Sequence, residues 1–170
     1  MGFFYNCFVC GIPMLFPYHF NSPLTLSAVK IQRENLKEFE RQHFADYSVF
    51  ELIASRTQFC DNLLKQLWQQ FELDKANLTL IAVGGYGRQE IFPLSDLDVL
   101  ILSKEERESE TEEKIAQFVQ FLWDCGFDVG HSVRSLEECE KEGKQDITIA
   151  TNLLESRYLS GDLSLFNALG

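Results

Sequence analysis

The sequence predicts an α+β fold in which a small mixed β-sheet is backed by helices and preceded by an N-terminal helical hairpin. Three observations favour this fold. Two amphipathic stretches come first, short apolar strands follow, and a helix with a regular apolar stripe separates two of those strands. With 170 residues, of which 45 % are hydrophobic and 24 % charged, the chain is long enough for one domain with a core and too short for two ordinary domains.

The N-terminal segment differs in composition from the rest, since its first 29 residues contain no Asp, Glu, Lys or Arg. We expect an irregular, loosely packed or disordered tail over residues 1–25 and a main domain over residues 26–170. Pro13 and Pro17 interrupt the aromatic run before it reaches about 20 apolar residues, which disfavours a membrane helix. A signal peptide is disfavoured because no basic n-region is present. Met14 is an alternative start.

The elements are expected in a simple order. A first helix enters at Ser22-Pro23, where proline suits the first turn, and runs to about Phe44. A second helix has an apolar stripe at helical spacing that we interpret as core packing. Glycine stops the third helix. The elements after the first helix are a helix 48–71, a strand 78–83 ending in a Gly84-Gly85 turn, a strand 96–102, a helix 111–125 stopped at Gly126, a strand 127–134, a helix 146–158, and a last helix capped by Asp162.

Charge and cysteine content exclude some functions. Fifteen basic and 26 acidic residues give a net charge of −11, so the overall basic footprint of a general nucleic-acid binder is missing. The five irregularly spaced cysteines favour reduced thiols in a cytoplasmic protein over a disulfide framework. The single C-x-x-C at Cys7 and Cys10 lacks the partners that a structural zinc site needs.

Two motifs carry the chemistry. Asp96 and Asp98 stand two residues apart in the expected strand, so their side chains face the same side. Two neighbouring carboxylates repel one another and are costly unless a cation lies between them. Mg²⁺ prefers such oxygen ligands and keeps positions free for phosphate oxygens. Gly84 and Gly85 allow the backbone to approach an anion closely, and Arg88 can hold a phosphate or brace the loop.

Other interpretations of the glycines fit less well. A P-loop needs a lysine that is missing, and a dinucleotide fingerprint needs glycine where Glu90 stands. The simpler alternative is a glycine turn followed by two surface aspartates on an edge strand. The two motifs together, eleven residues from Gly85 to Asp96, favour the functional interpretation.

The order strand, Gly-Gly, about ten residues and Asp-x-Asp resembles the nucleotidyltransferase superfamily of DNA polymerase β type. Within it, the strings Gly84-Gly85-Tyr86-Gly87-Arg88-Gln89-Glu90 and Pro93-Leu94-Ser95-Asp96-Leu97-Asp98 resemble the N-terminal region of the bacterial PII uridylyltransferase/uridylyl-removing family. Further similar stretches are 130–134, 153–157 and Gly161-Asp162. The resemblance covers the chain from about Leu26 onwards and implies a polymerase β-like core.

The resemblance implies transfer of UMP from UTP to a tyrosine hydroxyl of the PII signalling protein, with release of pyrophosphate. It implies that Asp96 and Asp98 are the catalytic residues and hold Mg²⁺, in a two-metal arrangement. Gly84 and Gly85 would donate backbone N–H groups to phosphates. Ser95 would add a hydroxyl contact, and Arg88 would clamp the nucleotide or brace the loop.

The sequence departs from the superfamily at the third carboxylate, which the next strand usually supplies. That position falls near Gly130, and Asp128, two residues earlier on the same face, is the nearby substitute. His131 is expected to pack or hydrogen-bond within the fold rather than bind metal. Arg134 is expected either to contact phosphate or to form a salt bridge with the Glu-rich helix.

Length is the second departure. Full enzymes of this family are several times longer and carry an HD hydrolase domain and two ACT domains, so the UMP-removing activity and the glutamine switch are expected to be absent from a chain truncated at its C-terminal end. Two alternatives remain open, an adenylyltransferase of the same superfamily and an inactive or nucleotide-binding remnant. We expect no nucleic-acid or membrane partner.

Overall fold

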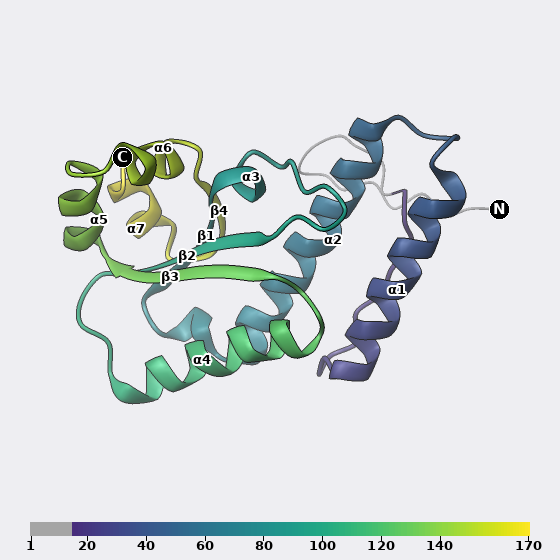
Figure 1. The fold of residues 1–170 in the computed structure, drawn as a ribbon. Coiled ribbons are helices and arrows are strands. Elements are labelled where there is room, and N and C mark those ends of the chain that lie inside the picture. Colours follow the sequence, from purple (N-terminus) through teal and green to yellow (C-terminus); the bar gives the residue numbers. More distant parts are fainter. Residues whose placement is uncertain (1–14) are drawn as a thin grey trace.

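The computed structural model describes residues 15–170, so Cys7, Cys10 and Met14 lie outside the described residues. Figure 1 shows a four-stranded sheet with helices on both faces, which confirms the expected α+β class. The elements are α1 (Leu26–His43), α2 (Val49–Gln70), a 3₁₀ turn η1 (Leu73–Lys75), β1 (Leu78–Ala82), α3 (Gly84–Gly87), β2 (Leu97–Ser103), α4 (Ser109–Asp124), β3 (Val129–Ser135), α5 (Leu136–Gly143), α6 (Ile147–Leu154), β4 (Arg157–Gly161) and α7 (Leu163–Ala168).

The sheet is mixed, with strand order β3-β2-β1-β4. Strand β1 runs antiparallel to both β2 and β4, whereas β2 and β3 are parallel and are joined by the crossover helix α4. The parallel pair matters for function, because β2 and β3 begin at the same end of the sheet. Asp96 and Asp128, which immediately precede these two strands, are thereby brought to one edge.

The two faces of the sheet have separate cores. Leu97, Val99 and Ile101 of β2 belong to the larger core, which also holds residues of α1, α2 and α4. Leu100 and Leu102 belong to a smaller core that includes residues of α5 and α7. Because side chains alternate along a strand, Asp98 lies on the face of the smaller core.

The hairpin follows the expectation with local differences. The first helix begins at Leu26, and Thr25, not the Ser22-Pro23 step, caps it by accepting a hydrogen bond from the N–H of Ala28. The expectation of a loosely packed tail is wrong for its described part, because Phe16 and Phe20 are buried and their rings contact that of Phe59. Within residues 15–170, no helix is both long and apolar enough to cross a membrane.

The second helix and the helix before Gly126 are confirmed closely. Ser48 caps α2 in a full capping box, and the expected stripe is buried except at its ends, where Val49 is exposed and Phe71 half-buried. Gly126 ends α4 with φ of +84°. At the C-terminal end, Asp162 caps α7 by accepting from the N–H groups of Ser164 and Leu165.

Three local expectations are wrong. The helix expected to run to Tyr158 ends at Leu154, because the next residues pair with β1 as strand β4 and bury Leu159. Helix α5 was not expected, although Ser135 and Glu138 form its capping box. The Gly84-Gly85 turn is the start of a one-turn helix, α3, and Gly84 has a left-handed φ of +57°.

Candidate functional site

Asp98 lies between two glycines that belong to different parts of the fold. A Cβ built on Gly84 would lie 3.5 Å from Oδ2 of Asp98, and one built on Gly130 would approach Oδ1 closer than 3.0 Å, a separation that real Cβ atoms essentially never show. Gly130 is the register partner of Asp98 in the neighbouring strand β3. The glycine at 130 therefore makes room for this carboxylate.

The ionised carboxylate of Asp98 lies in an electrostatically unfavourable environment. Partial burial raises the pKa of Asp98, and the negative charge of Asp96 raises it further. Among the described residues, neither carboxylate forms an ion pair with a basic side chain. The two carboxylates predicted from the sequence are thus close enough to repel one another and carry no internal counter-charge.

The carboxylate pair fits a hard divalent cation. Its donors are carboxylate oxygens, which Mg²⁺ prefers, and the adjoining glycine positions leave space beside Asp98. Within the part of the chain that the structure describes, no three His, Cys, Asp or Glu side chains converge on one point. An ion held by Asp96 and Asp98 would therefore take its remaining ligands from water and from the phosphate oxygens of a nucleotide.

The glycine loop is fixed by the connection between α6 and β4. A Cβ on Gly87 would come closer than 3.0 Å to the backbone oxygen of Glu155, so this position requires glycine. Arg157 donates to the carbonyl oxygens of Tyr86 and Gly87 at 3.2 and 3.4 Å. The same guanidinium makes two hydrogen bonds to the carboxylate of Asp61 in α2, at 2.7 and 3.1 Å. Helix α2 and strand β4 together position the loop.

Arg88 and Ser95 both have structural partners. The guanidinium of Arg88 donates to Glu90 and Glu155, which braces the loop against the end of α6. The hydroxyl oxygen of Ser95 accepts from the backbone N–H of Phe92 at 3.1 Å and so closes the turn that leads into Asp96. A direct contact of either side chain with a nucleotide stays a prediction.

Asn152 is a site residue that the sequence analysis missed. Its Oδ1 lies 4.0 Å from a Cβ built on Gly84, the same glycine that borders Asp98. It stands on α6, whose end also carries Glu155, the partner of Arg88. No local pattern marks this residue, because only the pairing of β4 with β1 brings α6 beside the glycine loop.

The other candidates on the third strand have distinct environments. Asp128 is exposed, and its carbonyl accepts from the N–H of Leu97 at 2.8 Å, but its role as a third carboxylate stays a prediction. His131 packs edge-on against Trp123 with ring centroids 5.7 Å apart, but both residues are exposed, so the contact lies at the surface and not in the core. Arg134 forms an ion pair with Glu142 of α5, so the salt-bridge alternative holds, with a partner on a helix that was not foreseen.

Comparison with known families agrees with this geometry. The family described as "Putative nucleotidyltransferase DUF294" matches residues 34–133, which include the glycine loop, both aspartates and Gly130. The chain belongs to this nucleotidyltransferase family. The match also includes α2, whose Asp61 holds the arginine that fixes the loop.

Similar curated proteins carry one description. The chain is 64 % identical over 157 residues to a "Bifunctional uridylyltransferase/uridylyl-removing enzyme" of Pasteurella multocida, which covers 92 % of this chain and 18 % of that protein. Proteins with the same description from Idiomarina loihiensis and Vibrio cholerae are 47 % and 42 % identical, over 84 % and 93 % of this chain and 16 % and 18 % of theirs. The chain thus spans less than a fifth of the length of these relatives. The resemblance expected from the sequence is confirmed.

Proposed function

We propose that residues 26–170 act as the nucleotidyltransferase domain of a PII uridylyltransferase, which transfers UMP from UTP to a tyrosine hydroxyl of the PII signalling protein. In this reaction the tyrosine oxygen forms a bond to the α-phosphorus, the bond from that phosphorus to the bridging oxygen breaks, and pyrophosphate leaves. The tyrosine proton passes to solvent. The descriptions of the relatives as uridylyltransferases support the uridylyl chemistry.

The observation that carries the proposal is the setting of Asp98. Its carboxylate lies beside Asp96, without a basic partner among the described residues, and between Gly84 and Gly130, where no side chain competes for space. A structural aspartate would be expected to have a hydrogen-bonded or ionic partner, because an unpaired buried charge is costly. A partly buried carboxylate without an ionic partner is typical of a ligand for a cation.

The residues of the glycine loop and the two aspartates would have different roles in binding the nucleotide. Asp96 and Asp98 would hold Mg²⁺, which when bound neutralises triphosphate charge and lowers the pKa of the attacking hydroxyl. Gly84 and Gly85 stand in the first turn of α3, where no helical carbonyl accepts their N–H groups, so these donors are available to phosphate. Arg88 would keep the loop in place through Glu90 and Glu155.

We also propose a cytoplasmic location. The three cysteines in the described residues, Cys60, Cys125 and Cys139, are free and buried, which is ordinary for a protein of a reducing compartment.

The proposal is tested by titrating the purified chain with UTP in the presence of Mg²⁺ by calorimetry, with ATP as the competing nucleotide. UTP binding should depend on Mg²⁺, should disappear in EDTA, and should be lost in the D96N/D98N double variant. The variant keeps the shape of both side chains and removes their charge, so its thermal unfolding serves as the folding control.

Three results would contradict the proposal. Equal or tighter binding of ATP would favour an adenylyltransferase. Absence of binding for both nucleotides, in a chain shown to be folded, would identify a remnant. UTP binding that survives in EDTA or in the double variant would refute the assignment of the two aspartates.

A further inference from the structure

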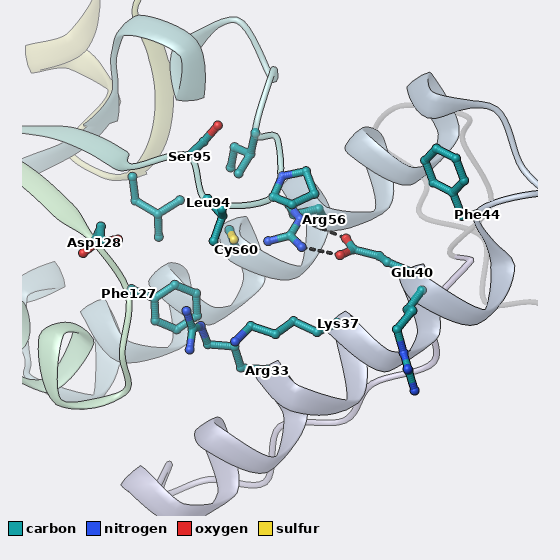
Figure 2. A pocket seen from close by; sticks show the side chains of 14 residues that line it. Arg33, Lys37, Glu40, Phe44, Arg56, Cys60, Leu94, Ser95, Phe127 and Asp128 are labelled. Carbon is teal, nitrogen blue, oxygen red and sulfur yellow. Dashed lines mark hydrogen bonds and ion pairs between the residues drawn. The ribbon is translucent and has the colours of Figure 1, made fainter.

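A cavity of about 540 Å³ lies between α1, α2 and the segment that leads into β2 (Figure 2). Ser95 and Asp128 line it, and they flank the place where β2 and β3 begin. Ser95 directly precedes Asp96 in the chain, and the carbonyl of Asp128 is hydrogen-bonded to the N–H of Leu97. The cavity therefore reaches the end of the sheet at which Asp96 and Asp98 lie, although neither carboxylate lines it and Asp98 lies on the opposite face of β2 from the lining residue Leu97.

The cavity adjoins the start of β3 at Asp128, and none of the loop glycines Gly84, Gly85 and Gly87 lines it. Gly84 flanks Asp98 from the direction of β1, whereas Gly130 of β3 flanks it from the other direction, and Asp128 leads into that same strand. In phosphoryl-type transfer the attacking and leaving oxygens lie on opposite sides of the phosphorus. If the glycine loop holds the leaving phosphates, the acceptor has to approach from another direction, and the cavity at the start of β3 offers one such approach.

The lining combines apolar surface with positive charge. Its charged side chains are four cations and two acids, a net charge of +2 in a chain whose net charge is −11. The lining residues used here are the cations Arg33, Lys37, Arg41 and Arg56 and the acids Glu40 and Asp128. Such a surface is complementary to an acidic partner with apolar side chains.

The cations differ in how firmly they are held. Arg56 is bound by Glu40, and the guanidinium of Arg33 lies 5.1 Å from the ring centroid of Phe127, so both form part of the wall. Figure 2 shows Arg33 and Lys37 on α1 facing the segment with Leu94 and Ser95. Lys37 pairs only with an exposed glutamate one turn earlier, Glu34. Since exposed pairs of this kind contribute little, its ammonium group can turn to a partner at small cost.

Leu94 is strained and exposed at the mouth of the cavity. Its φ is +71°, in the left-handed region that a bulky residue rarely adopts, and 92 % of its surface is accessible. A leucine in this position neither packs in the core nor relaxes the turn. Strain of this kind is typical of ligand-contacting segments. The neighbouring rings of Phe44 and Phe92 are also largely exposed, which extends the apolar rim.

We propose that this cavity is the docking site of the acceptor polypeptide, namely an acidic segment with apolar side chains that carries the target hydroxyl, with Leu94 and Lys37 as its contacts. The inference rests on the proposed function. A nucleic-acid occupant is disfavoured, because it would need several uncommitted cations in a row, and here Arg33 and Arg56 are already held.

The test measures acceptor binding and nucleotide binding separately on the same chain. Purified PII protein is titrated by calorimetry against the unaltered chain and against Leu94→Ala and Lys37→Glu, and Mg²⁺-dependent UTP binding is measured for each. Leu94→Ala keeps the β-carbon, so the backbone strain is unchanged and only the apolar contact is removed. Lys144→Glu reverses an exposed lysine outside the cavity lining and is the matched control for net charge.

We expect Leu94→Ala and Lys37→Glu each to weaken PII binding by about tenfold, with UTP binding within about twofold and Lys144→Glu without effect. Unchanged PII affinity in both cavity variants would overturn the proposal, as would an unaltered chain that binds no PII. An equal loss in Lys144→Glu would assign the effect to net charge and also overturn it. If the unaltered chain binds no UTP, the proposed function is refuted. The PII titration still decides the docking site in that case.

Discussion

Replacing Gly130 with alanine is expected to impair the site while leaving the fold intact. The added Cβ would come closer than 3.0 Å to Oδ1 of Asp98, whereas ordinary contact begins at 3.4 Å, so the carboxylate has to retreat by about 1 Å. The atom that moves is the end of a side chain on an open face. Rotation of Asp98 can relieve the clash without moving the backbone, so stability should change little.

The same displacement is large for a cation ligand. Changes in the residues that support metal ligands typically cost about 10–100-fold in metal affinity, and an error of about 1 Å in positioning can cost about 100-fold in rate. We therefore expect Mg²⁺-dependent UTP binding by Gly130→Ala to fall by about 10–100-fold. Its thermal midpoint should stay within a few degrees of the unaltered chain, because alanine in a strand is favoured over glycine by about 0.5–1 kcal/mol.

Gly87→Ala is the matched contrast, because its Cβ would meet backbone and not a side-chain end. The nearest atoms are the carbonyl oxygens of Glu155, closer than 3.0 Å, and of Ala82, at 3.0 Å. Neither can rotate away, so we expect a loss of about 1–3 kcal/mol of stability. Calorimetry and thermal unfolding on both variants check the pair. A folded Gly130→Ala chain that binds Mg²⁺-UTP normally would refute the ligand geometry of Asp98.

Three further outcomes follow from partners inside the fold. Arg157→Met leaves Asp61 unpaired and should lower the free energy of unfolding, measured in urea, by about 2–3 kcal/mol. The loss is smaller than for a fully buried pair because both side chains are about a fifth exposed, and adding Asp61→Asn to the same chain should recover part of it. Burial raises the pKa of Cys60 to about 12 and that of Cys125 to about 11. At pH 8 about one Cys60 thiol in ten thousand and one Cys125 thiol in a thousand is then ionised, so both should be alkylated far more slowly in the folded protein than in urea. Equal rates would contradict this. Ser48→Ala removes the cap of α2 and should lower stability by about 1 kcal/mol, read as a drop of about 2–4 °C in thermal midpoint.

Elements defined by their own periodicity were predictable from the sequence. Helix α2 was expected over 48–71 and runs from Val49 to Gln70, because a long apolar stripe and a capping serine both fix its position. The same holds for the run of Ile115, Phe118, Val119 and Leu122 in α4, all of which are buried. Local pattern and tertiary packing agree in these segments, so no distant contact had to be known.

Elements defined by distant partners were not predictable. Tyr158 lies in a stretch whose composition allows a helix, and it forms a strand because β1 offers an edge to pair with, almost eighty residues earlier. The role of Arg157 is hidden for the same reason, since its acceptors are Asp61 and the carbonyls of the glycine loop. Asn152 reaches the site only through this strand. The motif residues were visible in the sequence, whereas the residues that position them were not.

Gly130 in the third strand is interpreted differently from the sequence and from the structure. In the sequence, Gly130 occupies the position at which the resemblance implies a third carboxylate, so a metal ligand is missing there. In the structure, a side chain at 130 would collide with Asp98, so the glycine is what allows Asp98 its present orientation. A third acid there would also add charge to a pair whose repulsion already raises the pKa of Asp98. If Asp96 and Asp98 hold a cation as proposed, a site of only two carboxylates would leave more of the cation's charge for the phosphates of a nucleotide, in a chain whose net charge is −11. At position 130 the strand thus provides space in place of the third carboxylate that the resemblance implies, and Asp128 at its start lines the cavity beside α1 and α2.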